Sequence, residues 1–185
     1  MEEKVSFDYY ILLFFLVSFL GWIWEVCLYL VTEGEFVNRG ILIGPWLPIY
    51  GVGALFLYFL LNRWKKRPVA VFLISMIVCS VLEYASGCLL EKMWGVKWWD
   101  YSDMPLNLSG HVCILSSIMF GVGGVILIYF LMPLYKKLYQ KSPAKARTTI
   151  GLILLLIFII DAAYSADFPN AGSGITYRAD NLTDK

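Results

Sequence analysis

Long apolar stretches with at most one charged residue constrain the fold of this chain more than any other feature. Four apolar runs of about 20 residues cover residues 9–31, 41–61, 69–90 and 109–134. A helix of that length crosses roughly 30 Å of hydrocarbon. A fifth run, residues 148–164, is interrupted by Asp161, and we expect it to cross as well. The sequence therefore predicts an all-α, polytopic membrane bundle of about five transmembrane helices.

Composition points to the same class. The 185 residues are 59% hydrophobic and 16% charged, with a mean hydropathy of +0.69, which is too apolar for a soluble domain of this length. The lipid bilayer is therefore the expected partner. The net charge of +1 leaves no broad basic face, so nucleic acid is not expected as a partner.

The basic residues are unevenly distributed among the loops, and this predicts an orientation. They gather between the second and third runs and between the fourth and fifth: Arg63, Lys65, Lys66 and Arg67, then Lys136, Lys137, Lys141, Lys145 and Arg147. Basic loops are typically cytoplasmic. We expect a multi-pass protein of the cell membrane with residues 1–8 inside, one transmembrane domain over 9–164, and a polar tail over 165–185. Five crossings would place this tail outside, and four would place it inside.

Glu25 and Glu83 each stand alone in an otherwise uncharged run. A carboxylate at the centre of a membrane helix costs roughly 2.5–3.5 kcal/mol on insertion scales, so each requires a compensating environment. One interpretation is a shared polar site in the outer half of the bundle. The alternative is that each glutamate joins its helix to a neighbour through hydrogen bonds.

An internal repeat is suggested when the second run is aligned with the fourth. Gly40 then matches Gly110, and Gly51-Val52-Gly53 matches Gly121-Val122-Gly123, without a gap. Each copy is preceded by a run with a single glutamate. We interpret this as two helical hairpins related by an axis along the membrane normal, with the glycines allowing close helix contact.

The start of the second run is unusual because Gly44, Pro45 and Pro48 oppose a regular helix. Two structures are open here, a broken or re-entrant segment and a simple proline kink. Arg39 lies just before this segment, next to Asn38, and Glu25 is its natural intramembrane partner. The pair could bind an anionic ligand or only lock two helices together.

The loop between the third and fourth runs is rich in tryptophan and tyrosine, as expected at a membrane interface. Among these aromatics stand Glu91, Asp100, Tyr101 and Asn107, followed by His111. His111 could cap the fourth helix or form a proton relay with Glu83 or Glu91. Four cysteines lie in or beside the runs without metal-ligand spacing, so neither a metal nor a cofactor is expected.

Several motifs, in order, resemble one known group of proteins. They are Gly21-Trp-Ile-Trp-Glu25, Asn38-Arg-Gly-Ile-Leu-Ile-Gly-Pro-Trp-Leu-Pro-Ile-Tyr-Gly-Val-Gly53, Leu82-Glu-Tyr-Ala-Ser86, Leu90-Glu91, Trp98-Trp-Asp-Tyr-Ser102, and Asn107 with Gly110. Over about residues 9–135 the chain is similar to the CmpB-like ABC-transporter type IV membrane proteins. The family usually has arginine where this chain has His111, which weakens any role that needs a permanent cation there.

The resemblance implies a permease-like component. The sequence contains no Gly-x-x-x-x-Gly-Lys-Ser/Thr phosphate loop, so an ATPase would be a separate subunit. The alternatives are a noncatalytic assembly or interaction protein and, third, an intramembrane enzyme acting on lipid headgroups; no catalytic residue is assigned. A homo-oligomer stays open. The residues expected to form the polar site are Glu25, Asn38, Arg39, Glu83, Glu91, Asp100, Tyr101, Asn107 and His111.

Overall fold

The chain folds as an α-helical bundle in the computed structural model, which describes residues 6–177. Its helices are α1 (Phe7–Glu33), α2 (Pro48–Leu61), α3 (Pro68–Trp94), α4 (Ile114–Ile126), the π-helical turn η1 (Leu127–Leu131), α5 (Met132–Lys141) and α6 (Ala144–Asp167). α4, η1 and α5 form one continuous helix. That helix, α1, α3 and α6 are long and apolar enough to cross a membrane. The prediction of an all-α membrane bundle is confirmed.

Helix boundaries follow from proline and glycine. Pro48 and Pro68 occupy the first turns of α2 and α3, where a missing N–H group leaves no hydrogen bond unmade. Gly34 and Gly95 end α1 and α3 in the left-handed region, with φ of 78° and 71°. A side chain is strained in that conformation, so glycine is the favoured terminator.

The second predicted run differs most from the structure. Residues 40–47 are not helical, and α2 begins only at Pro48 rather than at residue 41. With 14 residues, α2 is about 21 Å long, shorter than the hydrocarbon layer. The broken segment, and not a kink in a continuous helix, is therefore the form adopted here. Residues 1–5 of the predicted cytoplasmic terminus and 178–185 of the predicted tail lie outside the described residues.

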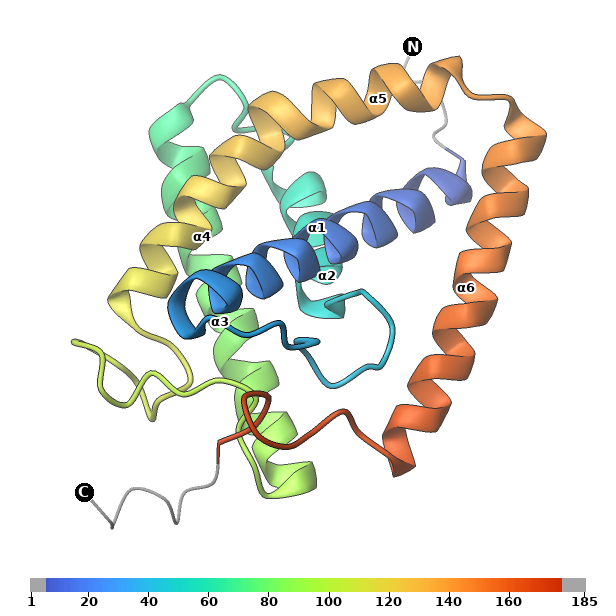
Figure 1. The fold of residues 1–185 in the computed structure, drawn as a ribbon. Helices are drawn as coiled ribbons and strands as arrows, with labels where there is room; N and C mark the ends of the chain where they lie inside the picture. The colour runs from blue at the N-terminus through green and yellow to red at the C-terminus, as the bar shows by residue number, and fades with distance from the viewer. Residues whose placement is uncertain (1–5, 178–185) are drawn as a thin grey trace.

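The bundle has two distinct ends (Figure 1). The turn 62–67 and α5 lie together at one end, which we call the basic end. Residues 34–47, 95–113 and 168–177 lie at the opposite end, which we call the loop end. Helix α6 returns from α5 to the loop end, so the tail that follows it reaches the same side as the two long loops.

The helices pack mainly as the pairs α1–α2 and α3–α4. A Cβ atom on Gly51 would lie 2.6 Å from the Phe14 ring, and one on Gly121 would lie 2.5 Å from the Phe72 ring. Phe14 precedes Glu25 by the same number of residues as Phe72 precedes Glu83. The two hairpins thus share a glycine-to-phenylalanine contact below each glutamate.

Candidate functional site

Glu25 lies in the loop-end half of α1 and contacts two other parts of the chain. One carboxylate oxygen is 3.5 Å from the Arg39 Nε atom, and the other accepts a hydrogen bond of 2.9 Å from the Tyr50 hydroxyl. The Glu25 side chain is 32% exposed. Its charge is therefore compensated by a guanidinium and by one neutral donor.

Two features of the sequence shape the contact between Tyr50 and Glu25. It lies in the first turn of α2, so the positive end of the α2 dipole is close to the carboxylate. On α1, a Cβ atom at Gly21 would approach the Tyr50 ring within 2.8 Å at several atoms. The absence of a side chain at Gly21 leaves the space that the Tyr50 ring occupies.

Glu83 on α3 has a different environment. One of its oxygens accepts a hydrogen bond of 3.1 Å from the Tyr101 hydroxyl, and the other accepts one of 3.0 Å from the Ser116 hydroxyl. The residue is only 6% exposed. Within residues 6–177, no lysine, arginine or histidine lies within salt-bridge distance of Glu83. A buried carboxyl group is thus held by neutral donors alone.

The two glutamates belong to one cluster. They are close enough to interact electrostatically, and both also act on the Tyr101 hydroxyl. Burial, followed by the Glu83 and Glu25 carboxylates, raises the pKa of Tyr101 well above its usual value. The phenol therefore keeps its proton and stays a hydrogen-bond donor.

Arg39 closes this cluster towards the loop end. Its guanidinium donates to the Gly174 carbonyl at 2.7 Å and to the Trp98 carbonyl at 3.2 Å, and it lies 5.2 Å from the centre of the Tyr29 ring. The residue is buried. The guanidinium therefore joins α1, the loop after α3 and the tail after α6 at one point.

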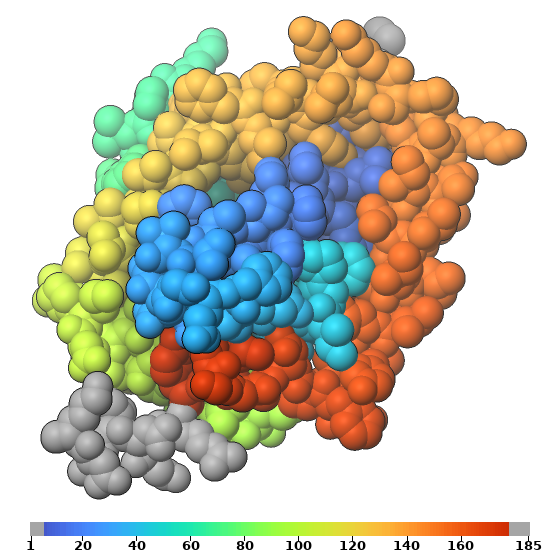
Figure 2. Space-filling model, viewed as in Figure 1, coloured from blue at the N-terminus to red at the C-terminus, as the bar shows by residue number. Residues whose placement is uncertain are grey.

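Residues 168–177 form a strap across the loop end, which Figure 2 shows packed against the segment that follows α1. Asn170 holds the strap in place. Its side-chain amide donates to the Asn38 and Gly40 carbonyls at 2.9 Å, and its main-chain carbonyl accepts a hydrogen bond of 3.0 Å from the Trp98 indole. The strap then pairs with Lys97 through the backbone of Tyr177. It also contacts Arg39 through the Gly174 carbonyl.

His111 and Glu91 form a second, separate pair. The His111 Nε2 atom lies 2.9 Å from a Glu91 carboxylate oxygen, beside Gly87, where a Cβ atom would lie 2.7 Å from the His111 ring. Glu83, Gly87 and Glu91 follow one another on a single face of α3 because they are four residues apart. His111 thus contacts the outer glutamate of this face, whereas Ser116 contacts the inner one.

The remaining expected site residues shape the loops. Asp100 accepts hydrogen bonds from the backbone and hydroxyl of Ser102, and Asn107 donates to the carbonyls of Ser102 and Met104. Asn38 accepts from the Trp22 indole at 2.6 Å. These contacts hold the loop end in shape, and none of them is made to either Glu25 or Glu83.

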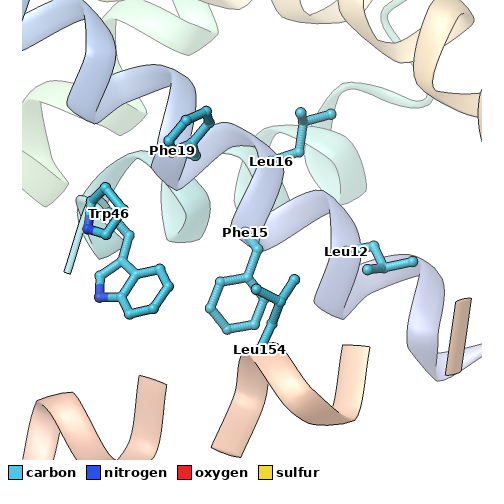
Figure 3. Close-up of a pocket in the computed structure, with 7 residues that line it drawn as sticks. Leu12, Phe15, Leu16, Phe19, Trp46 and Leu154 are labelled. Atoms are coloured by element: carbon cyan, nitrogen blue, oxygen red, sulfur yellow. The ribbon is translucent and has the colours of Figure 1, made fainter. Parts of the chain in front are cut away.

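Asp161 has its own partners, and none of its hydrogen bonds in the described part of the chain is made to Glu25, Glu83 or a residue that contacts them. It accepts hydrogen bonds from the backbone N–H groups of Ile43 and Gly44 and from the Trp46 indole, at 2.7–3.1 Å. It therefore ties α6 to the non-helical segment 40–47. Beside Trp46 lies an apolar cavity of about 400 Å³, drawn in Figure 3 and lined by Leu12, Phe15, Leu16, Phe19, Pro45, Trp46 and Leu154.

Comparison with known proteins assigns the chain to a family. Residues 12–166 match the family described as "Putative ABC-transporter type IV". The chain belongs to this family. No significant match was found among curated proteins or among solved structures. The match to the ABC-transporter type IV family ends just before the strap, so the contacts of Asn170 and Gly174 with the site lie outside the shared region.

Among the residues that the structure describes, no group of three or more histidine, cysteine, aspartate or glutamate side chains could hold a metal ion. The contributors to the cluster that were not among the expected site residues are Tyr29, Tyr50, Trp98, Ser116 and Gly174. The internal repeat could have indicated Tyr50, because the alignment of the second run with the fourth pairs it with Phe120, which lacks the hydroxyl. No sequence signal indicates that the tail reaches Arg39.

Proposed function

We propose that this chain is the membrane component of a transport system and that Glu83 is the group that takes up a proton during transport. The observation that carries this proposal is the environment of Glu83, which is buried among neutral donors while neighbouring Glu25 is paired with Arg39. A buried carboxyl without a cation must bind either a proton or a cationic ligand. Its place near the loop end favours exchange with the water on that side.

The family description supports a transport role and implies an ATPase partner. Because the sequence has no phosphate-binding loop, nucleotide hydrolysis would belong to a separate chain. The part proposed for this chain is to hold and release charge within the membrane. Arg39 and the α2 amino end would compensate the charge of Glu25, whereas Glu83 has only neutral donors as partners and is the group proposed to change charge.

The first experiment asks which carboxyl group holds a proton. The purified protein would be treated with a hydrophobic carbodiimide, which reacts with protonated carboxyl groups, and the modified residue identified by mass spectrometry. We expect modification of Glu83 to increase as the pH falls, with much less at Glu25. Arg39→Gln serves as a control, because Glu25 without its guanidinium should become reactive.

The second experiment measures function. Protein in vesicles containing a pH-sensitive dye would be tested for proton movement under an imposed membrane potential, as wild type and as Glu83→Gln. We expect Glu83→Gln to abolish the movement and Glu91→Gln, a change at the same end, to preserve it. A folded Glu83→Gln protein with the wild-type rate would refute the proposal.

A second candidate function is a packing role, in which the cluster only specifies how the helices assemble. It is favoured by the contacts themselves, because all four carboxylate oxygens of Glu25 and Glu83 have a partner within the chain. Under this alternative, the doubly neutral variant Glu25→Gln/Glu83→Gln would change stability but not transport. The flux measurement therefore separates the two functions.

A further inference from the structure

We propose that the basic end is a binding surface for anionic phospholipid headgroups, formed by α5 and the turn 62–67. This surface lies at the opposite end of the bundle from Glu83 and is independent of the proposed proton site (Figure 1). Neither element contributes to the carboxylate cluster.

The position of α5 places it at a membrane interface. It is the last part of the membrane-length helix that begins at Ile114, and α6 starts after it and returns across the bundle. Its ten residues span about 15 Å and run across the basic end (Figure 1). Because the chain reverses direction between α5 and α6, we place α5 at the level of the headgroups.

Helix α5 has one buried side and an exposed surface that carries both leucines and lysines. Met132 and Tyr135 are buried against the bundle, and the Tyr135 hydroxyl donates to the Tyr9 carbonyl at 2.6 Å. Leu134 and Leu138, one turn apart, form an apolar face that is 54% and 55% exposed. The lysines at positions 136, 137 and 141 are exposed as well; Lys137 and Lys141 lie beside the two leucines, whereas Lys136 lies on another side of the helix.

This arrangement fits a lipid surface better than a soluble protein. A helix at the interface directs its apolar face towards acyl chains and its lysines towards headgroups, with the lysine stems extending along the hydrocarbon boundary. Lys137 and Lys141 lie beside the exposed leucines of α5, so their stems can extend along the hydrocarbon boundary, and the lysine charge is complementary to anionic phosphates.

The turn 62–67 extends the same surface. The Tyr129 hydroxyl in η1 donates to the Lys65 carbonyl at 2.8 Å, which ties the turn to the helix that leads into α5. A shallow cavity of about 370 Å³, open to solvent, is lined by Arg63, Trp64 and Arg67, which are all exposed. Two guanidinium groups can bind a phosphate through paired hydrogen bonds, and tryptophan favours the interface. The cavity is therefore the proposed seat of one headgroup.

The test measures lipid preference directly. The full chain would be reconstituted in vesicles of equal parts phosphatidylcholine and phosphatidylglycerol, and the association of spin-labelled forms of each lipid compared by electron paramagnetic resonance. We expect the wild type to prefer phosphatidylglycerol severalfold. Replacing Lys136, Lys137 and Lys141 together by glutamine should lower that preference about fivefold. One lysine near an anionic surface contributes up to about this factor, so the loss of three is enough to produce it.

Two controls make the result decisive. The same three positions changed to arginine should keep the preference, because the charge is conserved, and Lys92→Gln at the loop end should leave it unchanged. Arg63→Gln/Arg67→Gln should also reduce it. A preference that survives the triple glutamine change in folded protein would overturn the proposal and indicate a soluble partner for α5. Equal loss in the triple arginine variant would overturn it as well.

Discussion

The guanidinium of Arg39 lies 3.5 Å from the carboxylate of Glu25 and at the same time donates to the carbonyl of Gly174. One side chain thus connects the intramembrane charge to the strap after α6. The charge balance of the cluster and the closure of the loop end therefore both depend on Arg39. The two can be studied separately by changing the partners of Arg39, which are Glu25 for the charge and the strap for the closure.

Loss of either member of this pair should destabilise the protein. For Arg39→Gln we expect about 1.5–3 kcal/mol of lost stability, the range for hydrogen bonds to charged groups, because Glu25 keeps only Tyr50 as a partner. Thermal unfolding in detergent measures the change. In a double-mutant cycle with Glu25→Gln, the second substitution should cost less than it does alone. Strictly additive losses would show that the two side chains do not interact.

The Tyr101 hydroxyl predicts a pH dependence. Because its pKa is raised in the folded state above the ordinary value of 10.0, the folded protein binds this proton more tightly than the unfolded chain. The associated stability is present below pH 10 and is lost as the pH rises above it. Tyr101→Phe should flatten the decline of the unfolding temperature above pH 10, whereas Tyr164→Phe, at an exposed position, should not. An unchanged alkaline profile in Tyr101→Phe would contradict this assignment.

The adjacent glycines Gly123 and Gly124 differ in how much space the packing of α3 on α4 leaves for a side chain. A Cβ atom at Gly124 would collide with the Ser75 side chain, whereas one at Gly123 would meet nothing within 4 Å. We expect Gly124→Ala to cost about 1–3 kcal/mol through overpacking between α3 and α4. Gly123→Ala should be close to neutral and serves as the matched control in the same unfolding measurement. Equal effects would mean that the α3–α4 contact is looser than described.

Asn170 should control the opening of the strap. Asn170→Ala removes two hydrogen bonds to the segment 38–40, worth about 1–2 kcal/mol in total, which corresponds to roughly five- to thirtyfold faster opening. Hydrogen exchange of residues 170–177 and 38–44 would report it. Asn107→Ala, the same change in the other loop, should leave exchange of the strap unaltered. Slow exchange retained in Asn170→Ala would place the strap's anchor elsewhere.

Local sequence signals predicted the elements that depend on local chemistry. The apolar runs predicted the membrane bundle, and Gly44, Pro45 and Pro48 raised the broken segment as one of two alternatives. The pairing of Glu25 with Arg39 was also proposed as a natural contact, and the structure contains it. Each of these depends on nearby residues or on a charge that must be compensated inside the membrane.

Contacts between distant segments were less predictable. Ser116 and Tyr50 are ordinary residues in apolar helices, and only the packing of α3 on α4 and of α1 on α2 brings their hydroxyls to the glutamates. Asp161, which interrupts the fifth apolar run, accepts hydrogen bonds from the backbone of residues 43 and 44, a contact that the sequence does not indicate. The strap's contact with Arg39 joins residues 135 positions apart, which no periodic pattern indicates.

The short length of α2 makes this protein sensitive to bilayer thickness. At about 21 Å the helix cannot match a thicker hydrocarbon layer by tilting, since tilting shortens its reach further. The mismatch must instead be absorbed by thinner lipid around α2 or by the non-helical residues above it. Because Tyr50 at the start of α2 holds Glu25, acyl-chain length acts on the same hydrogen bond that shapes the carboxylate cluster.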